Sequence, residues 1–158
     1  MEFENLLGKD LLSVEKIIGI DFVKKDYGYP FYIGEYFNND FFGMECSHIT
    51  LLTDDKDMLQ SISIHFPKIL NRKFYDLFIK KCGNPDNIQV IENRKIESKS
   101  FVKDDNGKVV QTLRKSTFDL REGSFEEKPL YIIWKKDNYE IKAFLRHKQN
   151  ISEITFSM

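Results

Sequence analysis

Two segments of the chain carry apolar residues at helical spacing. In residues 11–18 the apolar side chains recur every three or four positions, and Gly19 follows at a typical helix end. The same spacing recurs over residues 74–82, where a glycine follows and Pro85 prevents continuation. A shorter helical turn is expected over residues 3–7. The pattern therefore predicts two to three helices.

Most of the remaining chain consists of apolar or alternating runs between polar turns, which is typical of β-strands. Strands are predicted over residues 30–37, 41–46, 48–52, 58–66, 88–91, 96–102, 109–120, 130–136, 139–146 and 151–157. The segment Asn38-Asn39-Asp40 is predicted to form a hairpin turn. Because the turns are short, neighbouring strands should run antiparallel. The predicted fold class is α+β, with an antiparallel sheet of about eight strands and two to three helices packed on one face.

Length and composition indicate one folded domain. The 158 residues are 41% hydrophobic and 14% aromatic, which is enough to form a core. Shifting the sequence by 92 positions aligns residues 49–66 with residues 141–158 without a gap, and both segments are predicted hairpins. We therefore predict a single domain over residues 1–158 with an internal repeat of residues 1–68 and 69–158, each a helix followed by an antiparallel meander.

The run ENLLGKDLLSVEKIIG at residues 4–19, followed by strands, resembles the repeat unit of the beta-lactamase-inhibitor-protein-like architecture. In that family a short helical hairpin ending in glycine precedes a four-stranded antiparallel meander. The run KFYDLFIKKCGNPDNI at residues 73–88 is similar, and its G-x-P-D is close to the family's usual helix stop. The resemblance implies a non-enzymatic binder that presents the open face of its sheet to a protein partner.

The predicted hairpins assign side chains to two faces of the sheet. The expected register places Cys46 opposite His65 and Lys142 opposite Glu153. On the face away from the helices, mixed charge around an aromatic side chain suits a protein interface, and the alternative is an ordinary solvated sheet face. The candidate partner-binding residues are Glu140, Lys142, Phe144, Glu153, His48 and Ser63.

A metal site is a separate hypothesis on the same hairpin. The expected register would bring Cys46, His48 and His65 together, and these residue types can bind zinc. The alternative is a packed thiol beside two surface histidines. The acidic loop at residues 54–57 lacks the glycine and the bidentate glutamate of a calcium loop, so a solvated turn is expected there. We therefore expect no metal and no cofactor.

Charge and motifs narrow the function further. Lys and Arg number 24 and Asp and Glu 25, which gives no overall attraction to nucleic acid or to an anionic membrane. The chain contains no apolar run long enough to span a bilayer and no basic leader, so a cytoplasmic location is expected. Cys46 and Cys82 lack metal or redox spacing and are expected to be free thiols. No nucleophile-elbow, P-loop or dinucleotide-binding motif is present.

These observations favour a non-enzymatic protein-binding module. The most specific hypothesis is an immunity-type or inhibitor protein that neutralises a partner protein, either a toxin or another enzyme, through its sheet face. The alternative is a small-molecule or metal-binding domain with a pocket lined by Tyr and Phe. A third hypothesis is an enzyme whose catalytic residues meet only in the folded chain.

Overall fold

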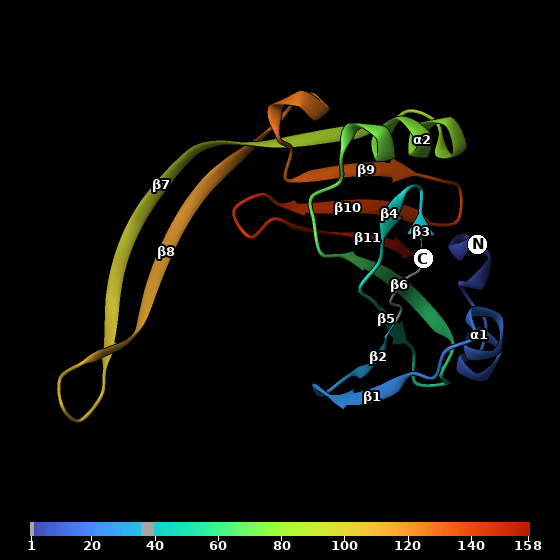
Figure 1. Cartoon of the computed structure of the whole chain (residues 1–158), viewed down its shortest axis with the longest axis horizontal. Coiled ribbons are helices and arrows are strands. Elements are labelled where there is room, and N and C mark those ends of the chain that lie inside the picture. Colours follow the sequence, from blue (N-terminus) through green and yellow to red (C-terminus); the bar gives the residue numbers. More distant parts are fainter. Residues whose placement is uncertain (1, 36–39) are drawn as a thin grey trace.

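The computed structural model describes residues 2–35 and 40–158, and an antiparallel sheet runs through the whole molecule (Figure 1). Nine strands form it in the order β1-β2-β5-β6-β11-β10-β9-β7-β8. The strands are β1 (Val23–Asp26), β2 (Pro30–Glu35), β5 (His48–Thr53), β6 (Leu59–Phe66), β7 (Asn87–Lys103), β8 (Val109–Glu122), β9 (Tyr131–Lys135), β10 (Glu140–Arg146) and β11 (Ile151–Ser157). The predicted α+β class with a large antiparallel sheet is confirmed, with nine strands in place of about eight.

The first α-helix begins and ends where the sequence predicts, and the second ends as predicted but begins two residues before the predicted residue 74. In α1 (Leu11–Ile18) the Asp10 side chain accepts a hydrogen bond from the first turn, and Gly19 ends the helix in a left-handed conformation. In α2 (Arg72–Cys82) the Asn71 side chain accepts the corresponding bond. The last turn of α2 carries two lysines, which interact favourably with the negative end of the helix dipole.

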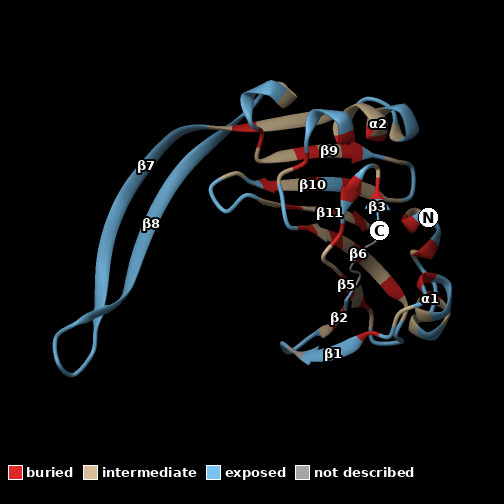
Figure 2. Cartoon of the chain, viewed as in Figure 1, coloured by how far each residue is buried: buried red, intermediate tan, exposed pale blue. Residues whose placement is uncertain are grey.

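The helices pack on one face of the sheet and bury a single core. A short 3₁₀ turn, η1 (Phe3–Leu6), joins them there, and the buried residues appear red in Figure 2. The helical side chains in this core are Phe3, Leu6, Val14, Ile18, Phe74 and Phe78. They meet alternate residues of the central strands, including Ile64, Ile154 and Phe156. In residues 2–35 and 40–158 no helix covers the opposite face of the sheet, which is called the open face below.

The structure differs from the sequence prediction in two details between residues 23 and 45. The predicted strand over residues 41–46 is a tight hairpin of β3 (Asp40–Phe41) and β4 (Met44–Glu45), because Phe42 and Gly43 both adopt positive φ and turn the chain. Strand β1 was not predicted, because its sequence VKKD is mostly charged. The predicted turn Asn38-Asn39-Asp40 lies mostly outside the described residues.

Within residues 2–35 and 40–158, no helix has the length and apolar character needed to cross a membrane.

The long hairpin of β7 and β8 extends beyond the rest of the sheet. Strand β7 joins the two strands predicted over residues 88–91 and 96–102 and has 17 residues. From residue 92 to residue 122 the described strand residues are exposed on both faces, and Figure 1 shows this segment arching away from the body of the protein. We call residues 92–122 the arm. Figure 2 shows that burial ends where the arm begins.

The single tryptophan provides a test of this fold. Trp134 is 1% exposed, contacts Phe78 with ring centroids 4.9 Å apart, and donates a hydrogen bond from Nε1 to the Gly83 carbonyl at 2.9 Å. Trp134→Phe removes this bond and leaves a void, so we expect the free energy of unfolding to fall by about 2 kcal/mol. Urea denaturation followed by circular dichroism measures it. Tyr29→Phe, at an exposed tyrosine, is the control and should change stability by less than about 0.5 kcal/mol.

Candidate partner-binding face

The predicted partner-binding residues all lie on the open face. Each alternates along its strand with residues that are buried in the core, and side chains point to opposite faces at successive strand positions. Lys142, for example, lies between Ile141 and Ala143, which are at most 1% exposed. The structure therefore places all six side chains on one face of the sheet.

One row of directly opposed residues crosses the open face. Along the register the row consists of Tyr131, Phe144, Glu153, His65 and His48, from β9, β10, β11, β6 and β5. It contains three of the predicted residues. Lys142 and Ser63 lie in the neighbouring row, joined through Thr155, whose hydroxyl is 2.6 Å from that of Ser63. Glu140 lies one row further along, beside Lys135.

Aromatic and basic side chains occupy one end of this row. The rings of Tyr131 and Phe144 stack with centroids 5.0 Å apart. The ammonium group of Lys142 lies 4.6 Å from the Tyr131 ring centroid, and the guanidinium of Arg146 lies 4.9 Å from that of Phe144. These are cation–π contacts, which hold the basic groups beside the rings. The four side chains thus form a preorganised patch, which we call the aromatic patch.

The histidines form the other end of the row. The rings of His48 and His65 stack 4.1 Å apart and are almost parallel. His65 is held by Thr50 through an Nε2 to Oγ1 hydrogen bond of 3.0 Å, and His48 Nδ1 lies 3.0 Å from the Ser47 hydroxyl. Glu153 connects the two ends of the row, 3.4 Å from His65 Nδ1 and 3.8 Å from an Arg146 nitrogen. Each polar side chain in this segment therefore has a fixed position.

Burial keeps these histidines neutral near pH 7. It lowers the pKa of His65 to about 4, and the nearby His48 and Arg146 act in the same direction. Burial also lowers the pKa of His48 and raises that of the Glu153 carboxyl. The Glu153 carboxylate would favour a charged His65, but the loss of solvent around both groups outweighs the attraction. The contact is therefore a close approach of a neutral imidazole to the carboxyl group, not a strong ion pair.

The structure differs from the predicted strand registers and does not bring the three candidate metal ligands together. His65 lies opposite His48, not Cys46, so the β5–β6 register differs from the prediction by two residues. In the C-terminal hairpin Lys142 lies opposite Thr155, and Glu153 lies opposite Phe144. Cys46 is buried in the core, whereas the histidines are on the open face. In residues 2–35 and 40–158, no cluster of three His, Cys, Asp or Glu is placed to hold a metal ion.

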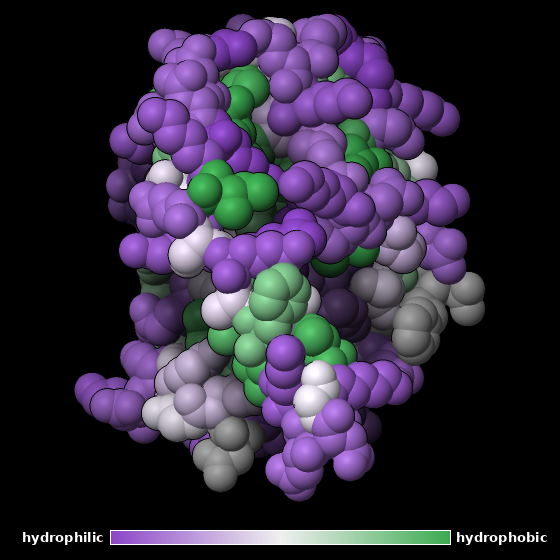
Figure 3. All heavy atoms as spheres, turned by 90° about the vertical axis from the view of Figure 1, so that its left-hand side faces the viewer, coloured by the Kyte–Doolittle hydropathy of each residue, from purple (hydrophilic) through white to green (hydrophobic). Residues whose placement is uncertain are grey.

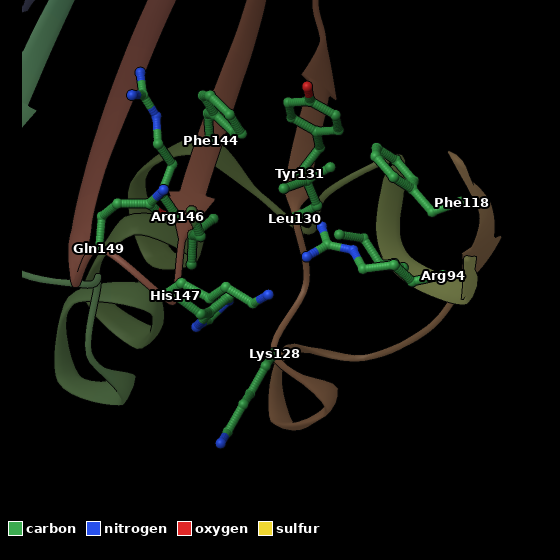
Figure 4. Close-up of a pocket in the computed structure, with 12 residues that line it drawn as sticks. Arg94, Phe118, Lys128, Leu130, Tyr131, Phe144, Arg146, His147 and Gln149 are labelled. Atoms are coloured by element: carbon green, nitrogen blue, oxygen red, sulfur yellow. The ribbon is translucent and has the colours of Figure 1, made fainter. Parts of the chain in front are cut away.

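A pocket lies beside the aromatic patch at the root of the arm. Its volume is about 500 Å³, and its walls come from the arm, from the start of β9 and from the turn after β10. Figure 4 shows Tyr131 and Phe144 side by side on one wall, and Arg94 and Phe118 facing them from the arm. Figure 3 shows apolar patches between hydrophilic side chains on the side of the molecule from which the arm projects.

Sequence reasoning missed several members of this site. Tyr131 could have been found, because the short turn between the strands predicted over residues 130–136 and 139–146 brings it close to Phe144. Arg146 could also have been found, because it lies an even number of positions from Lys142 on the same predicted strand and so points to the same face. No sequence pattern indicated Arg94 or Phe118, because these residues reach the pocket only through the path of the arm.

Comparisons with known proteins add no family. No family model matches the chain, and neither do any curated protein sequences or solved structures. The resemblance to the beta-lactamase-inhibitor-protein-like architecture therefore stays a prediction, and function is argued from the site alone.

The half-buried His65 makes stability depend on pH. Because its pKa is lower in the folded than in the unfolded chain, the unfolded state binds the proton first as pH falls. The stability is complete above the usual pKa of 6.5 and is lost as pH falls toward 4. Relative to His65→Gln, the wild type should lose about 2 kcal/mol more unfolding free energy between neutral and acidic pH. Urea titrations at a series of pH values measure this.

Glu153 is the necessary control for that experiment. Its raised pKa has the opposite sign, because the folded state takes up this proton first. The difference between wild type and His65→Gln should therefore persist in a Glu153→Gln background, and it should be constant above neutral pH. A difference that does not change with pH would show that His65 is not held neutral by burial.

Proposed function

We propose that this chain is a non-enzymatic protein-binding module of the immunity or inhibitor type, which binds and neutralises a partner protein through the open face of its sheet. The observation that carries this proposal is the aromatic patch, where two stacked rings lie between two basic groups on a face without a covering helix. Tyr and Arg are the residue types that most often dominate binding energy at protein interfaces. Their fixed positions reduce the entropy lost on binding.

The rest of the row supports the same function. The hydroxyl, imidazole and carboxyl groups between Ser63 and Glu153 offer donors and acceptors around the aromatic patch, as the polar rim of an interface does. Their hydrogen bonds hold them in place before a partner arrives. An inhibitor benefits from such a surface, because a preorganised face loses little free energy on binding.

We also infer that residues 1–68 and 69–158 are related repeats, as in the family that the sequence resembles. A shift of 92 residues places Ser63 on Thr155, and these two residues are direct partners across β6 and β11. The same shift carries the pair Ile62–Phe156 onto Ile154–Ile64. A pseudo-twofold axis between the hydroxyls of Ser63 and Thr155 accounts for all of these pairings.

A small-molecule-binding function is the second candidate, and the pocket of about 500 Å³ favours it. This volume is in the range of ordinary ligand sites, and two aromatic rings line one wall. A metabolite panel tested by thermal shift separates the two functions, since a bound ligand raises the melting temperature. A ligand that stabilises the chain without affecting partner binding would establish this second function.

The proposed function is tested by removing the aromatic patch. Lys142→Glu with Phe144→Ala reverses one charge and deletes one ring, so we expect at least about a hundredfold loss of affinity for the partner. The tagged protein first captures the partner from a lysate of the source organism or of organisms that live with it, and mass spectrometry identifies it. Calorimetry with the purified partner then measures the affinity.

The matched control changes the same kinds of side chain on the helix side. Lys80→Glu with Leu12→Ala alters an exposed lysine and an exposed apolar residue outside the open face. This control should leave affinity within about twofold, as expected for residues outside an interface. Equal loss in both variants, or no loss in the first, would refute the open face as the binding surface.

A further inference from the structure

The pocket at the root of the arm has an unbalanced charge. Four of its lining residues, Arg94, Lys128, Arg146 and Lys148, are basic, and no acidic residue lines it. Arg146 forms a long ion pair with Glu153 at 3.8 Å and lies against the Phe144 ring. Arg94 lies against the Phe118 ring, 5.5 Å from its centroid, instead of against a carboxylate. Within the described part of the chain the other three basic residues form no ion pair, so the pocket combines apolar walls with an excess of positive charge.

The same combination continues along one face of the arm. Strand alternation and the β7–β8 register place Arg94, Ile96, Lys99 and Phe101 on the same face as Thr112, Arg114, Ser116 and Phe118. We call this the apolar-basic face. Ile96 and Phe101 are each more than half exposed on it. None of these residues is acidic.

The two faces of the arm differ in whether their charged side chains form ion pairs. On the opposite face Lys115 pairs with Glu97 at 3.3 Å, and Arg121 pairs with Glu92 and Glu127. On the apolar-basic face Lys99 lies directly opposite Arg114. Like charges in direct cross-strand positions repel each other, and neither has an ion pair among the described residues. An acidic group from another molecule would relieve this repulsion.

The extent of this surface indicates the kind of ligand. From Phe118 to Thr112 it covers six strand positions, or about 20 Å, and the pocket adds to that length. A small molecule cannot contact all of it. An extended peptide chain can, because its side chains repeat at the same spacing as those of the arm. Beside its aromatic rings the surface carries aliphatic side chains, such as Ile96 on the arm and Leu130 in the pocket, which apolar peptide side chains cover better than stacked nucleic-acid bases do.

We propose that the pocket and the apolar-basic face of the arm bind an extended segment of the partner protein in which acidic residues accompany apolar ones. The apolar side chains cover Ile96, Phe101 and Phe118, and the carboxylates lie beside Arg94, Lys99 and Arg114. The inference rests on the proposed function for the origin of the segment, and it adds a second contact region to the open face.

The test uses a labelled nonapeptide in which Asp and Glu accompany Phe and Leu, together with the same peptide carrying Lys in place of every acid. Nine extended residues span about 30 Å, which matches the surface. Fluorescence anisotropy with the full chain should show binding at least about tenfold tighter for the acidic peptide, weakening as salt increases. Lys99→Glu with Arg114→Glu should reduce this binding at least about tenfold.

Lys95→Glu with Lys115→Glu is the matched control, because it makes the same charge change on the opposite face of the arm. It should reduce binding by less than about threefold. Equal effects of both double variants, or equal binding of both peptides, would overturn the proposal. So would preferential binding of single-stranded oligo-dT, or a self-association that depends on Lys99 and Arg114 without peptide binding. The assay contains no partner protein, so its failure leaves the open-face experiment unaffected.

Discussion

The pairing of β6 with β11 is the constraint on which the remaining structure depends. Among the described residues, this is the one strand pairing that joins β1, β2, β5 and β6 to the remaining five strands of the sheet. Ile62 and Ile64 face Phe156 and Ile154 across this junction, and all four are at most 2% exposed. Both helices pack on the strands around this junction, so the core and the open face both depend on the pairing of β6 with β11.

The face of each predicted partner-binding residue could be read from the sequence, but its neighbours could not. Side chains alternate with a period of two, so a register error of two residues leaves every side chain on its correct face. The error arose at the β5–β6 turn, where the ladder shifts between Leu52 and Thr53 and Asp57 adopts positive φ. Asp54 accepts backbone hydrogen bonds within this turn. Such local geometry decides the register and leaves little trace in the hydrophobic pattern.

For the arm, the sequence predicts the strands but not their position in the fold. Its two strands and the polar turn between them were predicted, because β-branched and aromatic residues flank Asp104-Asp105-Asn106-Gly107. Their mixture of charged and apolar residues also indicates exposure on both faces. What the pattern lacks is the path of the arm through space. Arg94, Tyr131 and Arg146 meet around one pocket although they belong to three separate strands, and only the fold brings them together.

The open face and the arm differ in how they are held, and this difference suits two parts of one binding surface. The row through Glu153 and His65 lies on strands whose other face forms the core, so its side chains keep their positions without a ligand. The arm has no such layer beneath it and depends on the pairing of two strands, which alone is only marginally stable in water. In the proposed complex, the partner docks on the rigid face, and the arm adjusts around one of its segments. Burial in the central strands thus determines which part of the surface is preorganised and which part can adapt.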